Sequence, residues 1–80
     1  MQKEKLSLSE LAPGMRARLK ELAVDGALRR RLFDLGLIPG TVIECRYLAP
    51  SGSPMAVRVR GTNLALRRQD AKKLFVELSV

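Results

Sequence analysis

The sequence predicts a mainly β fold, a small SH3-like barrel with one short α-helix, and three observations point to it. The chain has 80 residues, 46% of them hydrophobic, which suits one small core and leaves no material for a second. Several short segments carry apolar side chains at every second position, whereas one segment has helical spacing. Closing short strands into a barrel hides the edges that a flat sheet would expose. We therefore expect a single domain over residues 1–80, with an OB-like barrel as the alternative.

The first predicted strand covers residues 15–22. It follows the turn sequence LAPG, and within it Met15, Ala17 and Leu19 alternate with basic side chains. A period of two is typical of a strand with one buried face and one solvated face.

One short helix is expected after this strand. Leu28, Leu32 and Leu35 lie at positions i, i+4 and i+7, so they form one stripe on a helix of about two to three turns. Asp25 is a candidate N-cap, and Gly36 is a natural stop because glycine tolerates the left-handed conformation.

A tight turn and a second strand come next. Pro39 and Gly40 are adjacent, as in a type II turn, where proline fixes φ and glycine accepts a positive φ. Residues 41–47 then alternate in polarity. The side chains expected on the buried face of this strand are Ile43, Cys45 and Tyr47.

A loop and a third strand are expected after residue 48. The segment 49–54 contains Pro50, Gly52 and a second proline, which is typical of a loop. Residues 55–60 alternate again. The side chains expected to face inward are Met55, Val57 and Val59.

The last part of the chain predicts a turn, a helical turn and a closing strand. Gly61 marks the turn, and a short apolar segment follows it. Residues 67–73 are polar and predict a single exposed helical turn, and residues 74–78 predict the last strand.

The chain is strongly basic. Fifteen lysine and arginine residues against eight acidic residues give a formal net charge of +7, which attracts phosphate groups or anionic protein surfaces. Binders of single-stranded nucleic acid usually add aromatic side chains for base stacking, and here the aromatic residues are Phe33, Tyr47 and Phe75. A basic barrel that binds RNA or a ribosomal surface therefore stays the alternative to a protein-binding module.

The side chains of common catalytic and metal sites are missing. The chain has no histidine and one cysteine, Cys45, which we expect in the core. Soft and borderline metals need several histidine or cysteine ligands, and no glycine pattern for nucleotide phosphates occurs. We expect no enzyme activity, no cofactor and no metal site. Because the first ten residues lack the apolar core of a signal peptide, we also expect a cytoplasmic protein.

Four fragments in order make the sequence similar to a known family. They are the opening LSLSELAPGMRARL, the central RLFDLGLIPGTVIE, the pattern AP.G.P followed by VRG....LR, and the ending LALRRQDAKKLFVE. Together they resemble the ferrous iron transport protein A (FeoA) family over nearly the whole chain.

This resemblance implies a small cytosolic SH3-like barrel without enzyme activity. It also implies a partner, a large membrane permease for ferrous iron that carries its own GTP-binding domain, so contact with the membrane runs only through that permease. The barrel is similar to the C-terminal module of iron-responsive repressors of the diphtheria-toxin-repressor type. Because this chain has no winged-helix portion, we expect no DNA binding.

The chain departs from the family pattern in the loop. Where the family often has leucine and aspartate in APLGDP, this chain has Ser51 and Ser53. A leucine there would add apolar contact surface, and an aspartate would cap a turn. We expect Ser53 to take over the capping role because serine makes the same kind of local hydrogen bond more weakly.

The helical wheel places the basic side chains of residues 29–31 around the leucine stripe. Arg30 points away from the stripe, and Arg29 shares one flank with Phe33. Arg31 precedes Asp34 by three residues, which predicts a rim ion pair. This face is a solvated structural surface, a protein-docking surface, or a site for nucleic acid or lipid.

The sequence thus provides a short set of candidate partner-binding residues. We expect Phe33 on the helix and Met55 beside the loop to form one exposed apolar patch, although strand alternation places Met55 inward. The candidates are Arg29, Arg30, Phe33, Ser51 and Met55.

Overall fold

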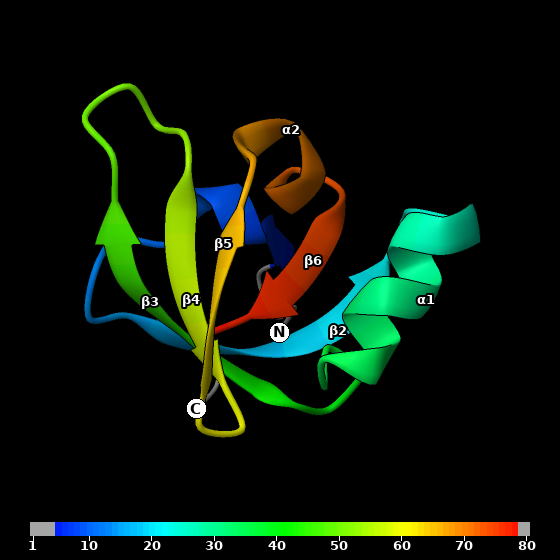
Figure 1. Ribbon diagram of the computed structural model, residues 1–80. Helices are drawn as coiled ribbons and strands as arrows, with labels where there is room; N and C mark the ends of the chain where they lie inside the picture. The colour runs from blue at the N-terminus through cyan, green and yellow to red at the C-terminus, as the bar shows by residue number, and fades with distance from the viewer. Residues whose placement is uncertain (1–4, 79–80) are drawn as a thin grey trace.

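Six strands form one antiparallel sheet in the computed structural model, which describes residues 5–78 (Figure 1). The strands are β1 (Lys5–Ser7), β2 (Arg16–Leu22), β3 (Val42–Leu48), β4 (Met55–Val59), β5 (Thr62–Leu66) and β6 (Leu74–Glu77). The helical elements are the 3₁₀ helix η1 (Leu8–Glu10) and the α-helices α1 (Gly26–Asp34) and α2 (Arg68–Ala71). Residues 1–4 and 79–80 of the expected domain lie outside the described residues.

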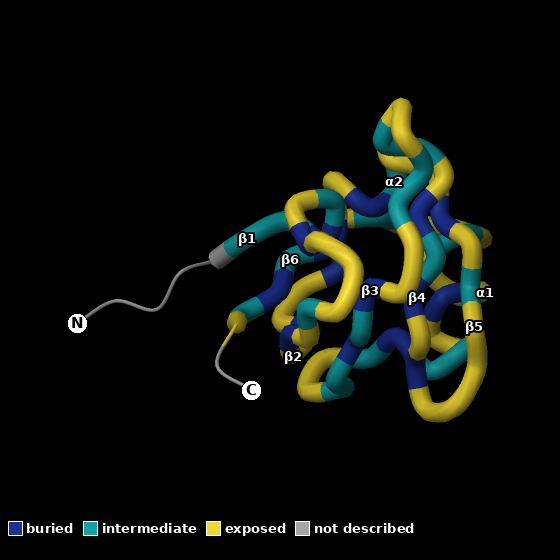
Figure 2. The backbone as a smooth tube through the Cα atoms, turned by 90° about the vertical axis from the view of Figure 1, so that its left-hand side faces the viewer, coloured by how far each residue is buried: buried dark blue, intermediate teal, exposed yellow. Residues whose placement is uncertain are grey.

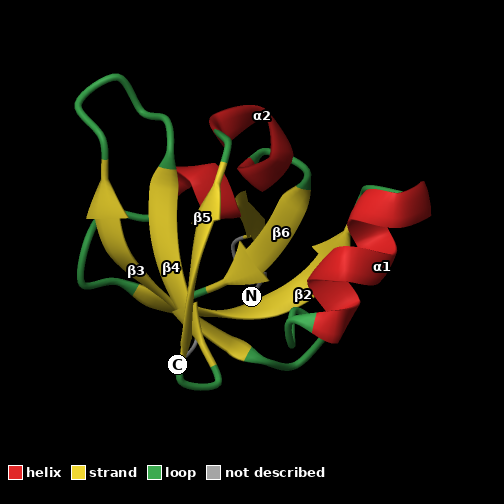
Figure 3. Cartoon of the chain, in the orientation of Figure 1, coloured by secondary structure: helices red, strands yellow, loops and turns green. Residues whose placement is uncertain are grey.

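The strand order is β1-β6-β2-β3-β4-β5, so the first strand pairs with the last and β5 lies at the other end of the sheet. The strands curl around one core, and α1 lies beside the sheet between β2 and β3 in the chain (Figure 3). The predicted mainly β fold is confirmed, as are the helix, the polar helical turn and the closing strand. The strand β1 and the helix η1 were not predicted, and β5 was expected only as a short apolar segment.

One cluster of apolar side chains fills the interior, and no polar or charged residue is buried among the described residues. Figure 2 shows buried and exposed positions following one another along the strands, and α1 contributes one buried residue, Leu32. The buried residues are Leu8, Leu11, Ala17, Leu19, Leu22, Leu32, Leu37, Ile43, Cys45, Met55, Val57, Val59, Leu66, Ala71, Leu74 and Val76.

The helix α1 ends at the predicted glycine. Gly36 has φ +102°, its amide donates to the carbonyl of Phe33 at 3.0 Å, and the amide of Leu37 donates to the carbonyl of Leu32 at 2.9 Å. These two bonds form a Schellman motif, in which Leu37 and Leu32 are the accompanying apolar pair. Asp25 is the N-cap residue, as predicted, although its side chain makes no capping hydrogen bond.

The turn after the helix also follows its local chemistry. The amide of Thr41 donates to the carbonyl of Ile38 at 3.1 Å, and Gly40 has φ +98°. Pro39 and Gly40 thus occupy the central positions of a type II turn, as predicted.

Two β-bulges change which side chains face the core. In β3 the pairing shifts between Cys45 and Tyr47, so that Tyr47 lies opposite Ala56. Its side chain is 54% exposed, and the predicted inward position of Tyr47 is wrong because the extra residue, Arg46, inverts the alternation. A similar shift occurs in β2 between Leu19 and Glu21.

Candidate docking site

The outer face of α1 carries an arginine held against an aromatic ring. The guanidinium of Arg29 lies 4.9 Å from the ring centre of Phe33 and donates a hydrogen bond of 2.8 Å to the carbonyl of Leu22. Phe33 is 37% exposed. The Arg29 side chain therefore ties α1 to the end of β2 and covers part of the aromatic ring.

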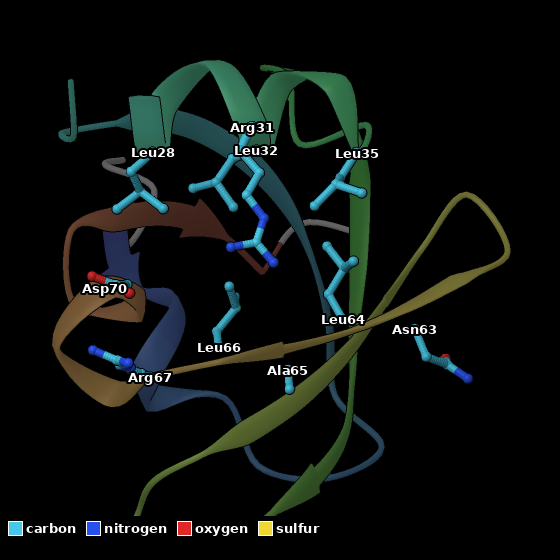
Figure 4. Close-up of a pocket in the computed structure, with 10 residues that line it drawn as sticks. All are labelled: Leu28, Arg31, Leu32, Leu35, Asn63, Leu64, Ala65, Leu66, Arg67 and Asp70. Atoms are coloured by element: carbon cyan, nitrogen blue, oxygen red, sulfur yellow. The ribbon is translucent and has the colours of Figure 1, made fainter. Parts of the chain in front are cut away.

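The neighbouring arginines of α1 point in different directions. Arg30 is exposed and lines, with Gly26, Arg29, Phe33 and Asp34, an open hollow of about 450 Å³. Arg31 instead extends toward β5 (Figure 4). Arg31 and Asp34 form no ion pair in the described chain, so the predicted rim pair is wrong.

The loop 49–54 lies far from α1, on the opposite side of the view in Figure 1. Ser51 is exposed and its hydroxyl donates to the carbonyl of Ser53 at 3.0 Å, while the amide of Gly52 donates to the carbonyl of Ala49 at 2.7 Å across Pro50. The hydroxyl of Ser53 accepts a hydrogen bond of 3.1 Å from the amide of Arg68, the first residue of α2. The expected role of Ser53 as a cap of its own turn is therefore wrong, because its hydroxyl caps the first turn of α2 instead.

Met55 does not belong to any exposed patch. It begins β4 and pairs with Leu48 and Leu66, and its side chain is 1% exposed. The hypothesis that Phe33 and Met55 share one apolar docking patch is therefore wrong. The alternation of β4 decides this, because every second side chain of the strand faces the core.

A groove lies between α1 and β5. Its volume is about 500 Å³, and Leu28, Leu32 and Leu35 point into it from α1 toward Leu64 and Leu66 of β5 (Figure 4). Leu32 and Leu66 are buried, whereas the other three leucines are partly exposed. The remaining lining residues are Arg31, Asn63, Ala65, Arg67 and Asp70.

The groove combines an apolar floor with excess positive charge. Arg31 and Arg67 are exposed and form no ion pair with any described residue. Asp70 supplies the single carboxylate among the lining residues. An apolar segment flanked by acidic side chains matches this lining, because each acid would pair with an arginine that has no partner within the described chain.

The described residues offer little for covalent or metal chemistry. Cys45 is fully buried, its Sγ lies 3.8 Å from the carbonyl oxygen of Tyr47, and burial raises the pKa of the thiol. No group of three histidine, cysteine or acidic side chains is placed to hold a metal ion within residues 5–78. In the same part of the chain, no helix has the length and apolar character needed to cross a membrane.

A family model described as the FeoA domain matches residues 6–78. The chain belongs to the FeoA family. This family is linked to ferrous iron transport. A fusion of Fe(2+) transport protein A with the Fe(2+) transporter FeoB from Porphyromonas gingivalis is 36% identical over 73 residues. Those residues are 91% of this chain but 9% of the fusion protein, so the chain spans a small part of that relative.

Solved FeoA structures have the same fold. The solution structure of FeoA from Chlorobium tepidum has 39% identity and a TM-score of 0.87, covering 94% of this chain and 71% of that chain. The crystal structure of Stenotrophomonas maltophilia FeoA complexed with zinc, described as an SH3 domain protein, has 33% identity and a TM-score of 0.74, covering 89% and 88%. The predicted SH3-like fold and the resemblance to FeoA are confirmed.

Sequence reasoning identified α1 but not the groove. The predicted candidates Arg29, Arg30 and Phe33 come together on the outer face of α1, whereas Ser51 lies apart from them. The sequence pattern predicts the lining leucines of α1 only as core residues. The partial exposure of Leu28 and Leu35 depends on how far α1 stands from β5, and the sequence contains no local signal for that distance.

Proposed function

We propose that this chain is a cytoplasmic accessory protein of ferrous iron uptake that acts by protein contact, without catalysis, on a FeoB-type transporter. The observation that carries the proposal is the relative in which a FeoA sequence and a FeoB transporter form one polypeptide. Two functions joined in one chain in one organism are expected to meet as separate chains in another. We further propose that residues 1–80 act as one domain.

The groove between α1 and β5 supports docking as the mode of action. It has an apolar floor of leucines and two arginines without ion-pair partners in the described chain. The outer face of α1, with Arg29, Arg30 and Phe33, lines a separate hollow on the other side of the helix. If this chain binds one nucleotide state of the transporter's GTP-binding domain more tightly than the other through this site, it shifts the balance between the two states.

The test is a binding measurement with the full-length FeoB-type transporter of the same organism, solubilised in detergent. Leu28→Glu places a carboxylate in the groove and should weaken binding by at least about 30-fold, the effect of about 2 kcal/mol. Ala27→Glu is the matched control, because it adds the same charge to an exposed position of the same helix that does not line the groove. It should change affinity by less than about threefold, within the range of surface substitutions.

Two results would contradict the proposal. One is that the unmodified chain does not bind the transporter at concentrations of about 100 μM, where even a weak complex forms. The other is that the chain binds the transporter and bulk RNA with equal affinity and that both affinities fall steeply as salt is added. That outcome would favour the RNA-binding alternative, because contacts to phosphate release counterions.

A further inference from the structure

The strand β5 has a free edge. It is the last strand of the sheet order and pairs with β4 alone among the described strands. The hairpin between them has a two-residue turn, Arg60 and Gly61, with φ +50° and +83°, and closes on the pair Val59 and Thr62. In such a hairpin the closing pair is hydrogen-bonded, and hydrogen-bonded and non-bonded pairs alternate along the ladder.

This alternation determines which backbone groups face outward. Thr62, Leu64 and Leu66 direct their amides and carbonyls toward β4, so Asn63 and Ala65 direct theirs away from it. The free edge therefore presents two donors and two acceptors at the spacing of a strand. All of Asn63, Leu64, Ala65 and Leu66 line the groove, so the edge opens into it.

A strand added beside β5 would lie in this groove. Neighbouring strands lie about 4.8 Å apart, and a segment paired with the five residues of β5 would be about 16 Å long. The volume of about 500 Å³ lies within the range of about 300–1,000 Å³ that is typical of ligand sites. On the side of the groove opposite β5, the leucines of α1 are placed to contact alternate side chains of such a segment (Figure 4).

We propose that β5 and α1 together bind one extended segment of the transporter, which adds to the sheet as a strand beside β5. The inference rests on the proposed function and specifies its contact. The segment carries apolar side chains at alternate positions, which pack against the leucines of α1 and β5, and acidic side chains near Arg31 and Arg67. Main-chain hydrogen bonds to Asn63 and Ala65 provide affinity, and the leucine floor provides selectivity.

Charge favours a transporter segment over a second copy of this chain. Each copy has a formal net charge of +7, so two copies repel each other at low salt. Arg31 extends toward β5 and Arg67 also lines the groove, and neither has an acidic partner in the described chain, whereas an acidic segment would neutralise both. The occupant is therefore an acidic and apolar extended segment.

Amide hydrogen exchange tests the added strand directly. The full chain is measured alone and saturated with the detergent-solubilised full-length transporter, and exchange is read residue by residue after an acid quench. The amides of Asn63 and Ala65 should exchange rapidly in the free chain and slow by at least about tenfold in the complex. The amides of Leu64 and Leu66 are already bonded to β4 and should change less.

A pair of substitutions provides the second measurement. Ala65→Pro removes the outward amide without removing a bond to β4, and should weaken transporter binding by at least about tenfold. Ala65→Ser keeps the amide at the same exposed position and should bind like the unmodified chain. If Ala65→Pro does not fold, as judged by its melting transition, the exchange measurement on the unmodified chain decides.

The outcomes separate this inference from the proposed function. Tight transporter binding without slowed exchange at Asn63 and Ala65 overturns the added strand and leaves the proposed function standing. Slowed exchange at the same amides in the concentrated chain alone, with dimers in sedimentation, overturns the choice of occupant. Absence of any binding to the transporter overturns the proposed function and the inference with it.

Discussion

Replacing Gly36 by valine should destabilise the fold far more than replacing Arg30 by alanine. Gly36 has φ +102°, and left-handed backbone costs an L residue about 1–2 kcal/mol, more when the side chain is β-branched. A Cβ at this position would also lie 2.9 Å from Cδ of Arg60, which must move. We expect Gly36→Val to cost roughly 1–3 kcal/mol. Arg30 is exposed, so Arg30→Ala should stay within about 0.5 kcal/mol.

Thermal unfolding followed by circular dichroism measures this difference. In a domain of this size each kcal/mol shifts the melting midpoint by about 4–8 °C, so Gly36→Val should melt roughly 5–20 °C below the unmodified chain. Gly40→Ala is a useful comparison, because Gly40 has a similar φ of +98° and no atom near its absent Cβ. The difference between Gly36→Ala and Gly40→Ala estimates the cost of the contact with Arg60.

A double-mutant cycle with Arg60→Ala separates the contact from the backbone strain. If the contact matters, Gly36→Ala should cost less in the Arg60→Ala background than in the unmodified chain. Equal melting midpoints for Gly36→Val and Arg30→Ala would refute the reasoning. They would mean that the Schellman motif does not depend on a left-handed residue at position 36.

Three further predictions concern the cap, the core and the thiol. Ser53→Ala should lower the free energy of unfolding in urea by about 0.5–2 kcal/mol, because the amide of Arg68 loses its acceptor. Ser53→Asp should be at least as stable as the unmodified chain. Equal stability of the two variants would contradict this cap. Met55→Glu should lower the melting midpoint or prevent folding, whereas Phe33→Glu should melt nearly like the unmodified chain, since only Met55 is buried. If Met55→Glu instead unfolds cooperatively at the temperature of the unmodified chain, its core position is contradicted. Burial raises the pKa of Cys45, so the stability that its neutral thiol contributes is complete below the unfolded pKa of about 8.5 and falls as pH rises through the folded value. Native Cys45 should therefore resist iodoacetamide at pH 8.5 and react after unfolding. Rapid labelling of the native chain would contradict its burial.

The features that sequence reasoning placed correctly depend on local chemistry. The end of α1 at Gly36 and the turn at Pro39 and Gly40 each follow from the backbone preferences of one or two residues. The stripe of α1 and the alternation of β4 follow from periods of 3.6 and 2. Such signals lie within a few residues of the feature that they predict.

The features that it missed depend on partners far along the chain. β1 has three residues, too few for a periodic signal, and it exists because β6 at the other end of the chain pairs with it. Tyr47 faces outward because a bulge adjusts β3 to the register of β4. The groove depends on the placement of α1 against the β5 edge, which no local pattern encodes.

The pairing of β1 with β6 also determines how the domain can be attached to a larger protein. Lys5 lies opposite Glu77, so both described ends leave from one edge of the sheet, whereas β5 and α1 lie at the other side (Figure 2). Because the ends and the groove lie on opposite sides, a covalent tether at either end would leave the groove unobstructed. Short flexible tethers give effective concentrations in the millimolar range, so a tethered groove fills even when its intrinsic affinity is about millimolar. A free chain must reach the same occupancy through its contacts and its abundance alone.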